Sequence, residues 1–360
     1  MAKLIGNAPN QVPTNADLGS MAFEDKKNYA TISSSIHQPY RNIIINGDMS
    51  IAQRGTSTSG VSTTGRFVLD RWKLNVDTMG AWTVSQSTDV PTGQGFASSI
   101  KWDCTTADAS PSASDNIQFQ QRFEGQNLQY IKKGTSSAES LTLSFWVKSN
   151  KTGTYIAELR DKDNSNRHIN KSYTISSADT WEKKTITFAG DTTGTLTNDN
   201  STSIDLNFWL GAGTDWTSGT LQTSWGASTS ANRAVGQVNL ADSTSNYINI
   251  TGVQLEAGTT ASDFEFLPYD VNLARCQRYF SKNTGSGGHI GYGGSIGDNY
   301  RHEIYLYPQV MRASPTLTVV WSAGTPGIQY VGTQSADIYT NMGNTTSIVN
   351  LTSVEGVAEL

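Results

Sequence analysis

Several short patterns in this chain contain residue types that could do chemistry. Gly293-Gly294-Ser295-Ile296-Gly297 matches the G-x-S-x-G pattern of a serine nucleophile. That nucleophile needs a strand before it, a helix after it and a parallel sheet beneath it. Here the pattern lies in a glycine-rich stretch, and His302 follows after only seven residues, too soon for a triad of that fold. We therefore expect no catalytic serine.

The sequence also contains no convincing motif for metal binding or redox chemistry. The four histidines are scattered, and His302-Glu303 is not followed by a second histidine at zinc-binding spacing. Asp161-Lys162-Asp163 offers oxygen ligands but lacks the spacing of a calcium loop, which favours a polar turn. Cys104 and Cys276 form no disulfide framework. The sequence thus predicts a protein that is not an enzyme, with no metal and no cofactor, although a pair of catalytic carboxylates cannot be recognised from sequence alone.

The aromatic residues are the stronger candidates. Trp146 and Trp209 alternate against apolar neighbours, so each is expected on the wet face of a strand, as a ligand platform or as a contact with a partner subunit. Trp216 and Trp225 lie in a long polar segment, where they could stack on sugars or fold back onto the core. The C-terminal tyrosines pose the same choice. The candidate carbohydrate-binding residues are Trp146, Trp209, Trp216, Trp225, Tyr300, Tyr305 and Tyr307.

Short strands are the elements that must position these side chains. Apolar residues alternate with polar ones in Leu141 to Lys148 and in Ile204 to Leu210, which indicates antiparallel strands with one buried face. In Tyr247 to Leu255 the buried phase shifts near Gly252, which predicts a β-bulge. Ten or eleven such strands between 41 and 268, with no helix long enough for a parallel crossover, predict an all-β, jelly-roll-like β-sandwich.

Three further segments flank the predicted sandwich. Residues 1–40 hold too few apolar residues for a core, so they either dock on another surface or form a disordered leader. Residues 269–282 are expected to form a connecting helix that Asp270 caps. Residues 283–360 are expected to form a small C-terminal β domain, which self-association would stabilise. Its predicted strands are Glu303 to Tyr307, Leu317 to Trp321, Ile328 to Val331 and Ser347 to Leu351.

Composition agrees with this organisation and excludes several classes of protein. Charged residues make up 16 % of the 360, against a usual ~25 %, which disfavours long helices. The net charge is −5 and no basic stripe occurs, so we expect no nucleic-acid partner. No apolar run could span a membrane, and the first residues lack the apolar region of a secretory signal. We expect synthesis in the cytoplasm.

Several of these segments together resemble a virion module of tailed phages, particularly marine ones. The resemblance begins at Arg41 to Gly55 and Asp70-Arg71-Trp72, and it continues in Leu141 to Lys151 and Trp181 to Lys184. Val253 to Gly258 and Leu273 to Phe280 are similar to the close of that module. Pro308 to Thr316 is similar to the start of the β domain that follows it, and Val12 to Gly19 looks like a phage leader.

This resemblance implies a homotrimeric tail fibre in the virion, made in the host cytoplasm, with a jelly roll like that of carbohydrate-binding modules. The leader would attach to other phage tail or virion proteins, and the protein would adhere to host cell-surface glycan without inserting into a membrane. A polysaccharide depolymerase tailspike, a head-decoration protein and a lectin-like module remain alternatives. The candidate docking residues are Val12, Pro13, Leu18, Met21 and Phe23.

Overall fold

The computed structural model describes residues 40–65, 68–284, 299–343 and 349–360. The chain divides into two units, Met1–Arg41 and Asn42–Leu360. The docking residues named above and the Gly293–Gly297 pattern lie outside the described residues. Within the described part of the chain, no helix has the length and apolarity that crossing a membrane requires.

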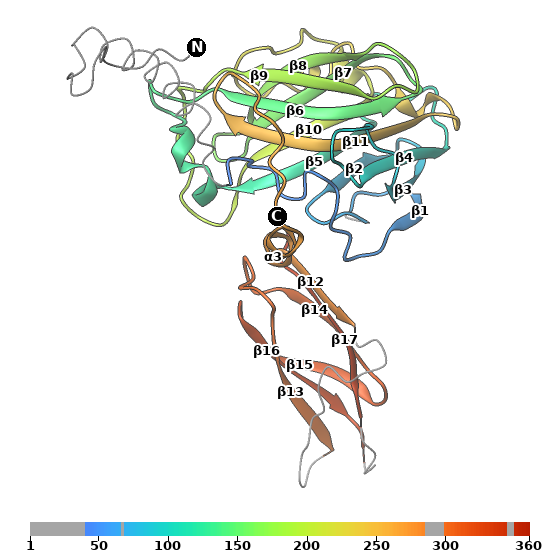
Figure 1. The fold of residues 1–360 in the computed structure, drawn as a ribbon, viewed down its shortest axis with the longest axis vertical. Coiled ribbons are helices and arrows are strands. Elements are labelled where there is room, and N and C mark those ends of the chain that lie inside the picture. Colours follow the sequence, from blue (N-terminus) through green and yellow to red (C-terminus); the bar gives the residue numbers. More distant parts are fainter. Residues whose placement is uncertain (1–39, 66–67, 285–298, 344–348) are drawn as a thin grey trace, which may run out of the picture. The chain divides into compact units, whose positions relative to one another are not determined.

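Two antiparallel sheets form the main part of Asn42–Leu360, and together they make a jelly-roll-like β-sandwich (Figure 1). The eleven strands described here agree with the ten or eleven predicted. The six-stranded sheet has the order β1-β3-β4-β11-β6-β9, and the five-stranded sheet has the order β2-β5-β10-β7-β8. Their bounds are β1 Ser57–Val61, β2 Lys73–Asp77, β3 Ala81–Ser87, β4 Ser99–Thr106, β5 Asn116–Glu124, β6 Leu141–Ser149, β7 Gly153–Asp161, β8 Arg167–Ile175, β9 Glu182–Phe188, β10 Thr202–Ala212 and β11 Tyr247–Ala257.

The core lies between the two sheets, because one side-chain phase of each strand is apolar. Leu143, Phe145 and Val147 of β6 are buried there and face Leu206 and Phe208 of β10 in one apolar cluster. The ring of Phe145 meets that of Phe208 edge-on, with 5.0 Å between centroids. The predicted bulge is confirmed: the pairing of β11 with β6 shifts register between Thr251 and Gln254.

Short helical turns connect these strands. They are η1 Gly125–Asn127, η2 Gln129–Ile131, α2 Thr214–Thr217, η3 Ser230–Asn232 and η4 Leu240–Asp242. The segment from 213 to 239 folds over the outer face of the five-stranded sheet: Trp216, Leu221 and Ala234 pack there against Ile156 and Trp209.

The predicted connecting helix is present but shorter than expected. Helix α3 spans Tyr269–Gln277, and Pro268 stands at its N-cap, so Asp270 lies in the first turn and is not the cap. The chain then enters β12, Phe280–Thr284, which pairs with β17. Phe280 therefore belongs to a strand and does not continue the helical face of Leu273 and Cys276.

The C-terminal part consists of two three-stranded antiparallel sheets, β12-β17-β14 and β13-β16-β15. Their remaining bounds are β13 Tyr300–Leu306, β14 Thr316–Trp321, β15 Thr325–Val331, β16 Ser335–Asn341 and β17 Leu351–Val357. The sequence predicted a strand from Ser347 to Leu351, of which residues 347 and 348 lie outside the described residues; β17 starts at Leu351. Strand β16 was not predicted. Val354 and Ile338, one from each sheet, belong to a shared buried cluster.

Candidate functional site

A groove with aromatic walls lies on the outer face of the six-stranded sheet. Trp146 of β6 projects there, because it alternates with the core residues Phe145 and Val147. Lys183 of β9 stands directly opposite Trp146, and Thr251 of β11 flanks it on the other side. The groove has a volume of about 310 Å³. Its lining, called here the aromatic groove, comprises Gly93, Gln94, Phe96, Ser144, Trp146, Lys183, Gly252, Asp263, Phe264 and Phe266.

Three phenylalanines form one wall of the aromatic groove. Phe96 packs against Phe264 and Phe266 with 5.1 Å between centroids in each case, and Phe264 and Phe266 are 4.8 Å apart. Phe96 is only 9 % exposed, whereas Phe266 is 50 % exposed. An exposed ring that two other rings hold in place is a rigid apolar surface, which a ligand can cover at little cost in side-chain entropy.

Polar side chains at the groove supply hydrogen-bonding groups beside the rings. Gln94, Lys183 and Asp263 are exposed, and they bring an amide, an ammonium and a carboxylate to one opening. Flat apolar rings with a few polar neighbours suit a ligand that has both C–H-rich faces and hydroxyl groups. This combination is what a sugar ring presents.

A second tryptophan extends the polar surface of the same sheet. Trp181 Nε1 donates to Asp89 Oδ1 at 3.0 Å, and Lys148, the next outward residue after Trp146, pairs with Asp89. Burial alone would raise the pKa of Asp89, but hydrogen bonds from Lys148 and Trp181 outweigh it and hold the pKa below its usual value. Asp89 is therefore ionised and fixes the position of both partners.

The predicted aromatic residues do not come together at one site. Among the residues predicted as carbohydrate-binding, Trp146 alone lines the aromatic groove. Trp216 and Trp225 are half-buried, and their indole nitrogens donate to the carbonyls of Ser114 and Ala189. Tyr300 is 39 % exposed and meets Tyr339 edge-on.

Three of these predictions are wrong about exposure. Trp209 does project away from the core, but the segment from 213 to 239 covers it and leaves it 0 % exposed, packed against Trp216. Tyr305 and Tyr307 are buried in the C-terminal apolar cluster, where they meet edge-on. None of the three can present its ring to a ligand.

The phenylalanine wall was not predicted from the sequence. Phe264 and Phe266 are two residues apart in an extended segment after β11, so their side chains leave the chain on the same side. That spacing was a usable signal. Phe96 comes from the segment between β3 and β4, and nothing local in the sequence connects it with the other two.

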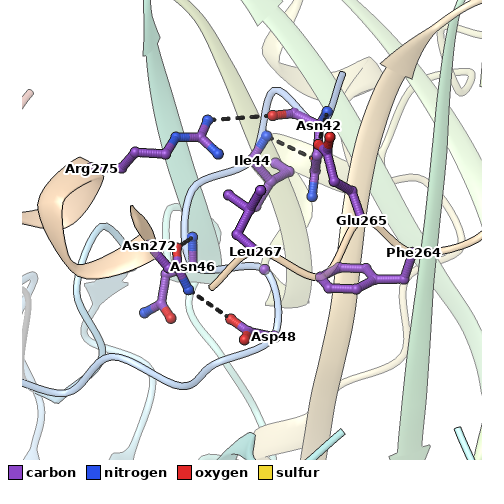
Figure 2. Close-up of a pocket in the computed structure, with 10 residues that line it drawn as sticks. Asn42, Ile44, Asn46, Asp48, Phe264, Glu265, Leu267, Asn272 and Arg275 are labelled. Carbon is purple, nitrogen blue, oxygen red and sulfur yellow. Dashed lines mark hydrogen bonds between the residues drawn. The ribbon is translucent and has the colours of Figure 1, made fainter. Parts of the chain in front are cut away.

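A second hollow lies where the segment from 42 to 48 meets helix α3 (Figure 2). The backbone N–H of Asn46 donates to Asn272 Oδ1 at 3.2 Å, and Asn272 Nδ2 donates to Asp48 Oδ1 at 3.0 Å. Arg275 Nη2 donates to the backbone carbonyl of Asn42 at 3.4 Å. The free space is about 10 Å³, the room of one water molecule. The hydrogen bonds around this hollow connect the segment from 42 to 48 with helix α3, and its free space is too small for an organic ligand.

A third hollow, of about 430 Å³, is lined by four charged residues and Val357, with no aromatic ring among them. Arg54 pairs there with Glu359, and Lys282 pairs with Glu355 at 3.4 Å. Its charges satisfy one another, which leaves the aromatic groove as the best candidate site. Among the described residues, no group of three or more His, Cys, Asp or Glu side chains could hold a metal ion.

Fold and site together define a β-sandwich protein with an aromatic groove on its six-stranded sheet. No protein-family model matches the chain, and no curated protein matches its sequence. Solved structures that resemble it include the enzymatically active domain of tailspike protein 4 from bacteriophage CBA120, at 16 % identity over 61 % of this chain, with TM-score 0.32. This chain covers 22 % of that protein chain.

Two carbohydrate-binding modules are also among the similar structures. TmCBM61 in complex with β-1,4-galactotriose is 11 % identical over 60 % of this chain and 99 % of its own, with TM-score 0.31. The family 11 module from Clostridium thermocellum in complex with a β-1,3-1,4-mixed-linked tetrasaccharide is 13 % identical over 57 % of this chain and 98 % of its own, with TM-score 0.27.

Proposed function

We propose that this protein is a non-enzymatic phage virion appendage that adheres to host-surface glycan through the aromatic groove. The observation that carries the proposal is the juxtaposition of Trp146 and the phenylalanine wall with Gln94, Lys183 and Asp263 in one opening. Exposed rings bind the apolar face of a sugar, and the polar groups beside them orient its hydroxyls. The resemblance of the segments at 41–55 and 273–280 to a tailed-phage module supports the virion setting.

We further propose that the protein is a homotrimer, attached to the particle by residues 1–40. The outer face of the sheet β13-β16-β15 supports self-association. On β13, Ile304 is 60 % exposed and Leu306 is 70 % exposed, and Tyr330 of β15 is 69 % exposed. Apolar side chains gathered on one sheet face favour burial against another copy. Three copies would also strengthen weak binding at each groove.

Titration with sugars tests the groove. We would measure binding of neutral oligosaccharides of galactose, glucose and xylose to the full chain by calorimetry. Trp146→Ala and Phe266→Ala should each weaken binding at least tenfold, because each removes a ring that the sugar covers. Tyr269→Ala is the matched control: Tyr269 is 63 % exposed but lies outside the groove, so its loss should change nothing. Equal affinity in Trp146→Ala and the wild type would reject the groove as the site.

Two further measurements test the rest of the proposal. Incubation with host polysaccharide should release no reducing ends, and their release would make the protein a depolymerase. Light scattering behind a sizing column should give three times the chain mass of 38.9 kDa. A monomeric mass that persists with residues 1–40 present would contradict the trimer and favour a lectin-like module.

A further inference from the structure

The outer face of the five-stranded sheet carries a row of polar residues beside the covered ring of Trp209. Five directly opposed positions form this row, one on each strand in the order of the sheet: Lys73, Gln120, Asn207, Glu158 and Asn170. Gln120 Nε2 donates to Asn207 Oδ1 at 2.7 Å, and Asn207 Nδ2 donates to Glu158 Oε2 at 3.1 Å. Arg233 closes the row with two bonds of 2.7 Å to Glu158.

The adjacent row has more positive charge than it can pair. Asp205 of β10 stands directly opposite Arg122 of β5 on one side and Arg160 of β7 on the other. Arg160 takes both carboxylate oxygens, with Nε–Oδ1 3.3 Å and Nη2–Oδ2 3.0 Å. Arg122 makes no hydrogen bond to either oxygen of Asp205, and its Nε is buried without any hydrogen-bond partner.

Lys162 adds a third cation just beyond the end of β7. Its backbone amide donates to the Ser203 carbonyl at 2.7 Å, which places it beside β10. Its Nζ donates to the amide oxygen of Asn166 at 2.6 Å, and within the described residues no carboxylate pairs with it. Arg122, Arg160 and Lys162 therefore gather around Asp205, and Glu158 is a second carboxylate that attracts Arg160.

The surroundings treat the three cations differently. Burial alone would lower the pKa of Arg160, but the attraction of Asp205 and Glu158 outweighs it and raises that pKa. Burial lowers the pKa of Lys162, and the positive charges of Arg160 and Arg122 lower it further. Burial also lowers the pKa of Arg122, and the attraction of Asp205 offsets this only in part. Both directions mean that the surroundings disfavour the charged forms, as expected where like charges gather in a partly desolvated place. A bound oxyanion would instead favour the charged forms of Arg122 and Lys162.

An orphaned acceptor lies beside these cations. Gln120 precedes Arg122 by two residues on β5, so both project to the same face. Gln120 is 0 % exposed, and its Oε1 has no hydrogen-bond partner. Unpaired buried acceptors are uncommon because each forfeits the solvation of its oxygen. Because Gln120 is fully buried, its oxygen lies beneath the surface that a ligand can reach, and the three cations alone define the candidate site.

We propose that Arg122, Arg160 and Lys162 form a second ligand site, which binds the carboxylate or sulfate group of an acidic saccharide. All three side chains remain partly exposed and can be reached from solvent. The Cα atoms of Arg122 and Arg160 are about 10 Å apart across the intervening strand, a span that allows two guanidinium groups to hold one oxyanion. The site lies on the opposite sheet from the aromatic groove and does not depend on it.

Titrations of the full chain with three probes at constant ionic strength test this site. The probes are inorganic sulfate, a galacturonate oligosaccharide, and a neutral galactose oligosaccharide of the same length. Sulfate and galacturonate should bind, and Arg122→Gln should weaken both at least tenfold while leaving any binding of the neutral sugar unchanged. Lys162→Gln should act in the same direction. Lys101→Gln removes one positive charge from the other sheet, outside the aromatic groove, and should leave all three affinities unchanged.

The outcomes separate this proposal from that of the groove. Loss of neutral-sugar binding in Trp146→Ala with galacturonate binding intact would support two independent sites. Sulfate binding without galacturonate binding would support the oxyanion site and overturn its assignment to a saccharide. Absence of sulfate and galacturonate binding in the wild type, or equal affinity in Arg122→Gln, would overturn the proposal. Arg122→Gln removes no side-chain hydrogen bond, so an unchanged melting temperature will show that the variant is folded.

Discussion

The ring of Phe96 lies against the backbone of Gly252, where a Cβ atom would stand 2.5 Å from the ring edge. Gly252 has φ +61° at the bulge of β11, and it lines the aromatic groove together with Phe96. The bulge thus does two things at once. It changes the register of β11, and it leaves room for the ring that supports Phe264 and Phe266.

Gly252→Ala should therefore displace Phe96 and distort the phenylalanine wall. Alanine at this φ costs about 1 kcal/mol, and forcing the ring aside adds about 2 kcal/mol. Gly60→Ala is the matched control, because Gly60 has a similar φ of +69° with nothing within 4 Å of its added Cβ. Urea unfolding should show the larger loss in Gly252→Ala, together with weaker sugar binding. Equal losses in the two variants would mean that strain alone matters and that the ring adapts.

Lys133 should contribute more to stability than its exposed neighbour. Its side chain is 3 % exposed, with Nζ 2.5 Å from Asp161, 3.1 Å from Asp191 and 2.8 Å from the Thr193 carbonyl. Lys133→Met leaves two buried carboxylates without this cation and should cost about 3–5 kcal/mol of unfolding free energy. Lys132→Met, at a side chain that is 54 % exposed, should cost less than about 1 kcal/mol. Comparable losses in chemical denaturation would contradict this account.

Glu124 should make the fold sensitive to acid. Burial would raise the pKa of Glu124, but hydrogen bonds from Arg278 and Tyr279 outweigh it and hold the pKa below the usual 4.5. Arg278 reaches this carboxylate with bonds of 2.9 and 2.8 Å. Because the folded pKa is the lower one, its stabilisation is present above pH 4.5 and is lost as pH falls through the folded pKa.

Glu124→Gln should reduce unfolding free energy by about 2 kcal/mol at pH 7, and this difference should shrink as pH falls below 4.5. Unfolding curves between pH 7 and pH 3 measure it. Glu139→Gln, at an exposed pair with Lys132, should follow the wild type throughout. A constant gap between wild type and Glu124→Gln at all pH values would show that the charge of Glu124 is not the cause.

The strands were predictable because alternation is a local signal. In Leu141 to Lys148 and Ile204 to Leu210 the buried phase is visible in consecutive residues, and the shift at Gly252 marked the bulge. The C-terminal strand from Leu351 was misplaced because its buried positions, Leu351, Val354 and Gly356, do not alternate regularly. Alternation of apolar and polar residues does not identify a strand whose buried positions are unevenly spaced.

The site was only partly predictable because a binding surface depends on contacts between distant segments. Alternation correctly placed Trp146 and Trp209 on the faces away from the core, but it could not tell which face another segment covers. The covering segment from 213 to 239 hides Trp209, whereas Trp146 stays partly open. Phe96 and Phe266 are 170 positions apart in the sequence and meet only in the folded chain.

Trp209→Phe tests whether burial removes Trp209 from ligand binding. Trp209 Nε1 has no hydrogen-bond partner, so phenylalanine loses ring volume but no hydrogen bond. The variant should lose about 1–3 kcal/mol of unfolding free energy through the cavity left behind. Its affinity for the neutral oligosaccharide should match the wild type within twofold, in contrast to Trp146→Ala. Weaker sugar binding in a stably folded Trp209→Phe would return this residue to the candidate site.

The proposed attachment through residues 1–40 predicts that their removal separates folding from incorporation into the particle. The strands and apolar clusters described above all lie within the unit Asn42–Leu360, so the shortened chain should keep its melting temperature within a few degrees. Sugar affinity should also persist, because every residue of the aromatic groove is retained. Incorporation into particles, measured by immunoblot of purified virions, should be lost. Particles that still contain the shortened chain would show that attachment uses a surface of Asn42–Leu360, and an unfolded product would show that the leader completes the fold.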